Sequence, residues 1–383
     1  MKKVCAISVF LASLCAGASL KAQSSVSEIS DAFLFKTSYT ADNVTNFRGG
    51  IKTGSTYLGM ANIRIGFDSE KAGWWKGGQF FTNAANTHGS SPSTQLLGDM
   101  QIASNIEAGN HMYLQELWIK QTFGKVEITA GLQDLNVEFA SSEHGALFLN
   151  SSFGILPVIS ANIPAPIFPL TSLGITTKWS LSENTSWLSA IYDGSPTDFD
   201  YNPYNTNWQF NSGDGILAIT ELQSVVEINH LAGCYKIGVY SHNHFFEKHF
   251  VPDFPDSLNH TIYGFYAYGD QTIWQHKNRN IGIFMQLGYS PSKLSLNSNY
   301  IGLGMNFTGW FGKSDPGILG IAMAHEYLKN DLGSETTIEL TFQKKLTRNI
   351  FIQPDLQYII NPSGKSSNLN NCLAGTIRIG LSF

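Results

Sequence analysis

The sequence is poor in charged residues, in cysteine and in long apolar runs. Asp, Glu, Lys and Arg make up 14% of the 383 residues, against roughly 25% in an average soluble domain. Of the four cysteines, only Cys234 and Cys372 lie beyond the N-terminal leader, which is too few for a disulfide framework. No later stretch reaches about 18 apolar residues without a charge, so no transmembrane helix is expected.

Signatures of enzymes and of nucleic-acid binding are also missing. There is no basic run that could follow a phosphate backbone. The chain has no Gly-x-Ser-x-Gly elbow, phosphate-binding loop or dinucleotide fingerprint. The densest group of metal-type side chains, His242, His244, Glu247 and His249, lacks the His-Glu-x-x-His spacing. We therefore expect no enzymatic activity, no metal or other cofactor, and no nucleic-acid partner.

The first 22 residues have the layout of a secretory signal peptide. Lys2 and Lys3 precede an apolar stretch over residues 4–20, and the small residue Ala22 marks the expected cleavage site. Lipid modification at Cys15 is a less favoured alternative, because the residue before it is not small. Cleavage after Ala22 removes three lysines and leaves a formal net charge of −8.

Alternation of apolar and polar residues is the strongest pattern in the remaining chain. Successive side chains of a strand point to opposite faces, so the pattern predicts strands with one apolar and one water-facing side. Aromatic residues reach 13% and glycine is abundant, as in a membrane β-barrel, whereas a secreted β-sandwich is the alternative. At the C-terminus, the apolar face carries Leu373, Gly375, Ile377, Ile379, Leu381 and Phe383.

Sixteen candidate strands follow from this pattern. Several are ten residues or longer, which is the length of a tilted membrane strand and longer than a typical sandwich strand. A barrel of about 16 strands encloses an aqueous lumen. The candidates are residues 32–40, 57–68, 76–84, 112–122, 126–133, 173–180, 184–193, 215–228, 231–241, 260–268, 279–290, 298–309, 317–327, 335–344, 349–359 and 371–383.

The connections between these strands alternate in length. Those after even-numbered strands are mostly short, and those after odd-numbered strands are often long, as expected for periplasmic turns and external loops. The connection 269–278 is an exception to this rule. The long connections are residues 85–111, 134–172, 194–214 and 242–259.

The segment 134–172 is the candidate constriction of the lumen. At 39 residues with four prolines it is too long and too stiff for an ordinary connection. Its middle, residues 148–169, is apolar for an exposed loop. We expect it to fold inward against the barrel wall; packing over neighbouring loops or against another subunit is the alternative.

The alternation also predicts which polar side chains point into the lumen. Their carboxylate, amide and guanidinium groups can bind sugar hydroxyls, and an aromatic face can pack on a pyranose ring. A solvated wall that contacts no particular solute is the alternative for each. The candidate pore-lining residues are Arg64, Glu116, Trp118, Lys120, Glu339, Gln353, Asp355, Gln357 and Arg378.

Several stretches resemble the carbohydrate-selective porins of the OprB type. The most specific is IQPDLQYIINP at residues 352–362, which is similar to the penultimate strand of that family. QELW at 115–118 followed by GLQDLN at 131–136, and LNSSFG at 149–154, resemble the same family. Asp134 and Asn136 in the second of these stretches complete the candidate pore-lining set.

The resemblance implies an all-β, transmembrane antiparallel barrel of about 16 strands. It would sit in the bacterial outer membrane, surrounded by lipid, and pass mono- and small oligosaccharides by passive diffusion. The resemblance also implies that the terminal Phe383 is recognised by the outer-membrane assembly machinery, and it allows a monomer or a homo-oligomer. The expected organisation is a signal peptide (1–22), an N-terminal segment with the first strand (23–50), and the rest of one barrel domain (51–383). A porin for other solutes, a surface adhesin and an outer-membrane hydrolase are the alternatives.

Overall fold

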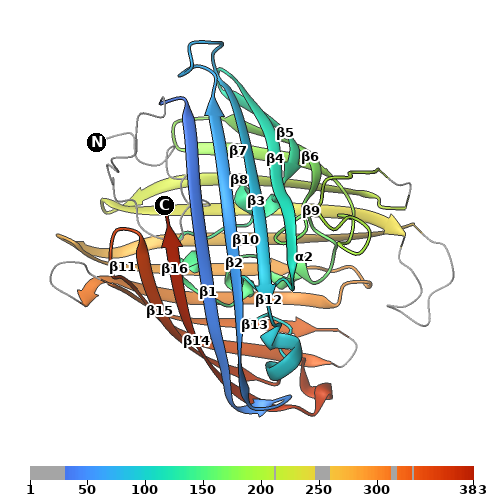
Figure 1. The fold of residues 1–383 in the computed structure, drawn as a ribbon, viewed down its shortest axis with the longest axis vertical. Coiled ribbons are helices and arrows are strands. Elements are labelled where there is room, and N and C mark those ends of the chain that lie inside the picture. Colours follow the sequence, from blue (N-terminus) through green and yellow to red (C-terminus); the bar gives the residue numbers. More distant parts are fainter. Residues whose placement is uncertain (1–30, 211–212, 246–258, 312–316, 330–331) are drawn as a thin grey trace.

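In the computed structural model, the described residues form one closed barrel of sixteen antiparallel strands (Figure 1). The structure describes residues 31–210, 213–245, 259–311, 317–329 and 332–383. Each strand pairs with its neighbours in sequence, and β1 pairs with β16 to close the sheet. The strands are β1 (Phe33–Gly50), β2 (Gly54–Asp68), β3 (Gly78–Gly89), β4 (His111–Phe123), β5 (Val126–Gln133), β6 (Ser172–Ser180), β7 (Thr185–Asp193), β8 (Ile216–Ile228), β9 (Leu231–Phe245), β10 (Asn259–His276), β11 (Arg279–Tyr289), β12 (Asn297–Phe311), β13 (Gly317–Leu328), β14 (Gly333–Lys345), β15 (Ile350–Ile360) and β16 (Asn370–Ser382).

All sixteen predicted strands are confirmed, with two corrections to their limits. The first strand continues through residues 41–50, which the prediction left out because they are mostly polar. The predicted connection 269–278 is wrong, because β10 runs through it to His276. The residues that the prediction left out, 269–276, are mostly polar, and a register shift between Thr272 and Trp274 interrupts the alternation there. The predicted signal peptide lies outside the described residues.

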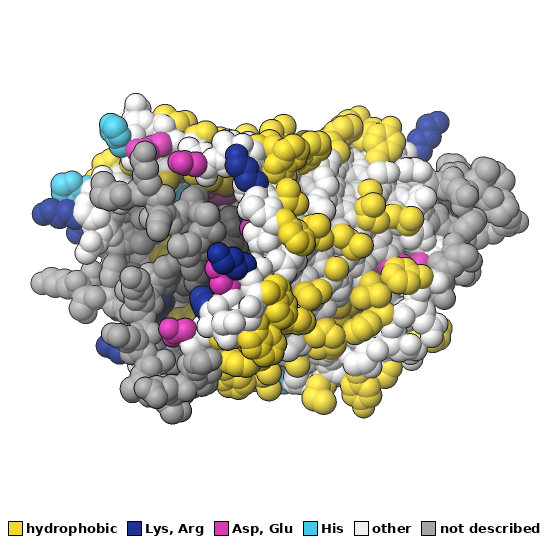
Figure 2. Space-filling model, turned by 90° about the horizontal axis from the view of Figure 1, so that it is seen from above, with side chains coloured by type: hydrophobic (Ala, Val, Ile, Leu, Met, Phe, Trp, Pro, Cys, Tyr) yellow, Lys and Arg dark blue, Asp and Glu magenta, His cyan; other side chains and the backbone are white. Residues whose placement is uncertain are grey.

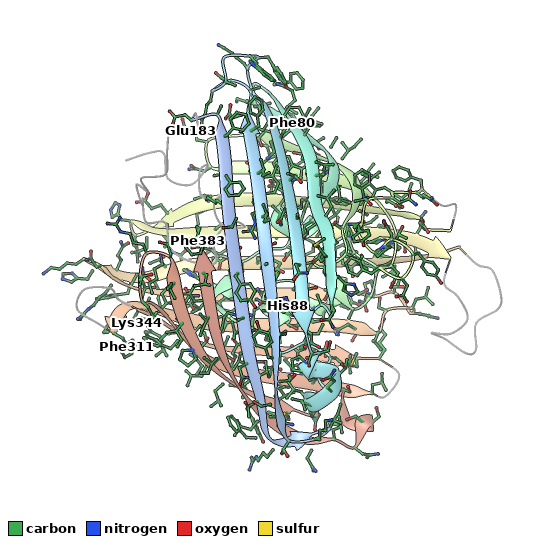
Figure 3. All side chains as sticks on the ribbon, viewed as in Figure 1. Phe80, His88, Glu183, Phe311, Lys344 and Phe383 are labelled. Carbon is green, nitrogen blue, oxygen red and sulfur yellow. The ribbon has the colours of Figure 1, made fainter. Side chains whose placement is uncertain are left out.

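The outer face of the barrel is apolar. On β2, Ile63 and Ile65 point outward and are 49% and 44% exposed, whereas Asn62 points inward and is 2% exposed. Hydrophobic side chains gather in rows over the outside of the wall, with few charged side chains among them (Figure 2). Phe80 and Phe311 are exposed aromatic side chains of this surface (Figure 3). Such a surface suits lipid.

The two-residue turns and the longest connections lie at opposite ends of the barrel, as predicted. Two-residue turns at 124–125, 229–230 and 277–278 follow β4, β8 and β10, and they contain the positive φ angles that tight hairpins require. The longer connections 90–110 and 134–171 follow β3 and β5. No helix among the described residues is long and apolar enough to span a bilayer.

The connection over residues 134–171, here called the long inward loop, builds an apolar core inside the barrel. Its side chains pack against the inner faces of β7 to β13, which carry tyrosine, phenylalanine and aliphatic residues. Each fully buried side chain of this size stabilises the packing by about 1.5–3 kcal/mol. The loop side chains with at most 1% exposure include Phe139, Phe148, Phe153, Leu156 and Ile159.

Candidate functional site: the constriction of the barrel

Carboxylates on the barrel wall hold the main chain of the long inward loop. Glu339 on β14 is fully buried and accepts hydrogen bonds from the N–H groups of Leu149 (2.6 Å) and Asn150 (3.0 Å). Charge-assisted bonds of this kind are stronger than neutral ones, and they offset part of the cost of burying the carboxylate. The predicted inward folding of this loop is therefore what the structure shows.

Two further wall carboxylates act in the same way and were not among the predicted residues. Asp270 on β10 accepts hydrogen bonds from the Ser142 hydroxyl (2.6 Å) and the His144 N–H (3.0 Å). Glu221 on β8 accepts one from the N–H of Ala140 (2.8 Å). The loop is thus fastened at three points spread over β8, β10 and β14.

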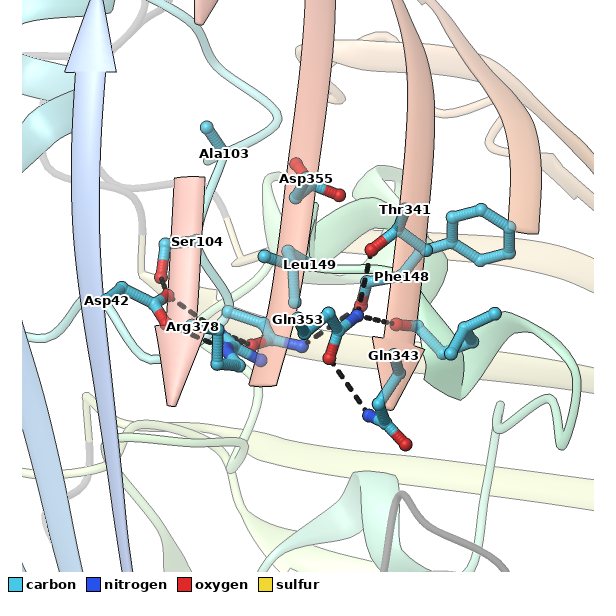
Figure 4. A network of polar contacts seen from close by, with 12 residues as sticks. Asp42, Ala103, Ser104, Phe148, Leu149, Thr341, Gln343, Gln353, Asp355 and Arg378 are labelled. Atoms are coloured by element: carbon cyan, nitrogen blue, oxygen red, sulfur yellow. Dashed lines mark hydrogen bonds and ion pairs between the residues drawn. The ribbon is translucent and has the colours of Figure 1, made fainter. Parts of the chain in front are cut away.

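Amide side chains of β15 bind loop carbonyls beside these carboxylates. Gln353 is 1% exposed, and its Nε2 donates to the carbonyl of Leu147 (2.7 Å) and to the Thr341 hydroxyl (2.9 Å), as Figure 4 shows. Gln357 donates to the carbonyl of Ala103 (2.8 Å) and to Asp355 (3.2 Å). These β15 side chains point inward, as predicted, and the structure places them under the loops.

A second connection, residues 90–110, also folds into the barrel and is here called the short inward loop. The N–H groups of Met100 and Gln101 donate to the carboxylate of Glu335 at 2.9 and 3.0 Å. The N–H of Asn105 donates to the carbonyl of Leu149 at 2.8 Å, so the two loops are joined. The long connection predicted here is confirmed, but the sequence did not predict that it folds inward, where it contacts β14 and the other loop.

Buried carboxyl groups on the short inward loop have raised pKa values. Burial raises the pKa of Asp99 to about 6. Burial raises the pKa of Glu107 to about 7, and the nearby charge of Asp99 adds to the shift. Both groups therefore change protonation near neutral pH.

Arg378 is engaged in a buried ion pair. Its Nε and one terminal nitrogen each lie 2.7 Å from the carboxylate oxygens of Asp42 on β1. Ser104 and Asn105 of the short inward loop add hydrogen bonds to this pair at 2.7 and 2.8 Å (Figure 4). The pair joins β16 to β1 at the barrel seam and lies beneath the loop.

Asp134 and Asn136 lie at the base of the long inward loop. Asp134 accepts a hydrogen bond from the N–H of Asn136 (2.9 Å), and burial raises its pKa to about 6. The Asn136 amide donates to the carbonyls of Phe139 (3.2 Å), Ala140 (3.1 Å) and Gly154 (3.2 Å). These contacts shape the point at which the loop leaves β5.

The inner face of β1 to β4 near the turn end, here called the open wall, carries aromatic and charged side chains together. Trp118 stacks on Phe81, with ring centroids 5.0 Å apart. The Trp118 indole N–H donates to Glu116 (3.3 Å), and Lys120 Nζ lies 5.5 Å from the indole centroid. Arg64 donates to the Ser38 hydroxyl on the next strand (3.2 Å). Trp118 and Arg64 are only partly buried.

The structure therefore sorts the predicted residues into three places. Beneath the inward loops lie Glu339, Gln353, Asp355, Gln357 and Arg378. At the base of the long inward loop lie Asp134 and Asn136. On the open wall lie Arg64, Glu116, Trp118 and Lys120. The alternation in residues 215–228 places Glu221 on the inner face, but the prediction did not include this residue. No signal pointed to Asp270, because its segment was taken for a connection.

The described residues include few other groups that could form a redox or metal site. Cys234 is half-buried and Cys372 is buried, and the two do not form a disulfide with each other. No group of three or more His, Cys, Asp and Glu side chains in this part of the chain converges in a way that could hold a metal ion. Glu247 and His249 lie outside the described residues.

Comparison with solved structures identifies barrels of the same fold. The high-pH structure of OprB from Pseudomonas putida superposes with a TM-score of 0.82 and 18% identity, covering 92% of this chain and 94% of that one. The low-pH structure of the same protein gives a TM-score of 0.61 and 16% identity, covering 92% and 93%. Salmonella typhi OmpF gives 0.58 and 8% identity over 92% and 97%. These likenesses support the fold.

Comparison of sequences identifies the family. Porin B of Pseudomonas aeruginosa is 22% identical over 407 residues, which cover 91% of this chain and 87% of that protein. The profile of the family described as "Carbohydrate-selective porin, OprB family" matches residues 52–383. The chain belongs to the carbohydrate-selective porins of the OprB family and is a sugar-preferring porin of the bacterial outer membrane.

Proposed function

We propose that sugars cross the constriction along the open wall, with Trp118 as the surface on which the sugar ring packs. The Trp118 indole is only partly buried and stacks on the buried ring of Phe81, so it presents an apolar face of the kind that the C–H groups of a pyranose can cover. The hydrogen bonds of the long inward loop described above fall on β8 to β15, on the side away from this pair. This arrangement is the observation that carries the proposal.

Charged groups around the stacked pair supply hydrogen-bond partners for sugar hydroxyls. Arg64 and Lys120 are donors, and Glu116 is an acceptor when ionised. Acidic and basic groups lie together on this wall, so a neutral solute with many hydroxyls can exchange water contacts for wall contacts. We propose that these residues, with Trp118, contact the solute, whereas the candidates beneath the loops determine the shape of the passage.

The same proposal makes the chain a passive channel without enzymatic activity. The charged groups of the open wall are paired along a passage and do not isolate one nucleophile beside a base.

We also propose that Phe383 is recognised by the outer-membrane assembly machinery. Its side chain is 72% exposed, and its N–H donates to the carbonyl of Thr37 on β1 (2.9 Å), so the C-terminus is held while the ring stays accessible.

Sugar block of ion current through single channels in planar bilayers tests the residue assignment. Loss of ring packing in Trp118→Ala should weaken the affinity for maltose about 2- to 10-fold. Trp179→Ala is the matched control, because Trp179 is 49% exposed on the outer face of β6. Equal affinities in the two variants would refute the role of Trp118. Liposomes that stay closed to every sugar with the unmodified protein would contradict the porin function itself.

A further inference from the structure

Lys120 lies between two carboxylates at the edge of the open wall. Its Nζ is 3.6 Å from Glu127 on β5 and 3.6 Å from Glu138 on the long inward loop. The same nitrogen lies 5.5 Å from the ring centroid of Trp118. One cation therefore links the wall, the loop and the aromatic surface that we assign to the sugar.

The main chain at Glu138 is held against the barrel wall. Its carbonyl accepts a hydrogen bond from Gln223 Nε2 on β8 (3.0 Å), and Gln223 also donates to Glu221 (2.6 Å). The next two residues, Phe139 and Ala140, are fully buried. The carboxylate of Glu138 thus reaches from a backbone anchored on β8 to a lysine on β4.

The environment of Glu138 makes this ion pair more than a surface contact. Its side chain is 22% exposed and that of Lys120 is 9% exposed. Its Oε2 is buried and has no hydrogen-bond donor among the described residues. Charges that are partly withdrawn from water are screened less by salt, so their effect on a passing ion is larger than at an open surface.

We propose that Glu138 is a specificity-determining residue that, together with Glu127, neutralises Lys120 and makes the passage beside Trp118 favour neutral sugars over anionic sugar derivatives. The cluster of one lysine and two glutamates carries a net charge of −1, which repels carboxylated or phosphorylated sugars. Without Glu138 the cluster is neutral and Lys120 is freer to attract an anion. The inference rests on the proposed function, since it concerns the same passage.

Ion selectivity measured on the full-length protein in planar bilayers tests this inference. The zero-current potential in a KCl gradient gives the ratio of chloride to potassium permeability. In Glu138→Gln this ratio should rise about twofold or more, because a fixed negative charge is removed and a positive one is released. Uptake of gluconate relative to glucose by proteoliposomes should rise with it.

Two controls separate the ion pair from a general loss of negative charge. Glu143→Gln removes the same charge from an exposed side chain of the same loop, and it should change the ratio less. In a Lys120→Met background, Glu138→Gln should have a smaller effect than in the unmodified protein, because there is no lysine to release. Heat-modifiable migration of each variant on gels confirms that its barrel is folded.

These measurements distinguish a role of the ion pair from a general effect of negative charge. A larger effect of Glu138→Gln than of Glu143→Gln, reduced in the Lys120→Met background, supports the proposal. Equal effects of the two glutamine variants, or an unchanged effect without Lys120, overturn it. Failure of the proposed function has a different signature, namely that neutral sugars do not reduce the ion current of the unmodified protein at all.

Discussion

The two sides of this barrel are built from different antiparallel strands of one sheet and use their inner faces differently. On β1 to β4 the inner face carries charged and hydroxyl groups such as Lys36, Ser38 and Arg64 and remains partly exposed. On β7 to β13 the inner face carries an apolar cluster, with carboxylates such as Glu221 and Asp270 beside it, and is covered by the long inward loop. One side is therefore a water-facing channel wall, and the other is half of a protein core. The docked loop therefore narrows the lumen that the sixteen strands enclose.

Loss of a core side chain should have the largest effect on this difference. Phe153 is fully buried on the covered side and packs on Phe148 and Phe284 with ring centroids 5.0 and 5.8 Å apart. Phe153→Ala should destabilise the docked loop by about 3–5 kcal/mol, because it leaves a cavity. Single-channel conductance and the largest sugar admitted by proteoliposomes should both increase.

A phenylalanine on the outer face of the same side is the control. Phe265 on β10 is 48% exposed to the membrane, and Phe265→Ala should leave conductance and size limit unchanged. If the two variants behave alike, the apolar core inside the barrel does not limit the passage.

Weakening one carboxylate anchor should have an intermediate effect. Asp270→Asn keeps the shape of the side chain but reduces its strength as an acceptor for Ser142 and His144, at a cost of about 1–3 kcal/mol. We expect more frequent brief openings to a higher conductance level. Asp200→Asn, at an exposed position in the 194–215 connection, should show none. Unaltered current noise in Asp270→Asn would argue against an anchoring role.

The smallest expected effect is a pH dependence of the short inward loop. The pKa values of Asp99 and Glu107 are raised by burial to about 6 and about 7, so the docked loop binds protons more tightly than the undocked one. The stability that this provides is full below the ordinary carboxyl pKa of about 4 and is lost as the pH rises through 6–7. Hydrogen exchange of residues 99–107, corrected for intrinsic rates, should therefore be less protected at pH 8 than at pH 5. Asp99→Asn should reduce that difference; undiminished protection at pH 8 in the unmodified protein would contradict the prediction.

Sequence alternation predicted the fold well because lipid and water impose opposite chemistry on the two faces of a strand. The clearest cases are β14 and β16, where Glu339 and Arg378 point inward and Ile338 and Ile379 point outward. The same rule missed the end of β10, because a register shift between Thr272 and Trp274 interrupts the alternation there. Pattern-based prediction thus works where the alternation is regular and fails where a bulge breaks it.

The sequence predicted the direction in which the candidate side chains point better than it predicted the residues that they contact. Alternation placed Gln353 and Glu339 on the inner face, but their partners lie about 200 positions away in sequence, at Leu147 and Leu149. Local periodicity contains no information about such long-range contacts. The stacking of Trp118 on Phe81 was missed for the same reason, because it depends on the pairing of β3 with β4.

The anchors of the long inward loop have a consequence for how such a channel can diverge. Glu221, Asp270 and Glu339 hold the loop mainly through its main-chain N–H groups, which every residue except proline carries. No proline lies between residues 140 and 150. Side chains on the water-facing side of this stretch can therefore be exchanged over evolutionary time while the attachment persists, so that one inherited barrel can serve cells that live on different nutrients.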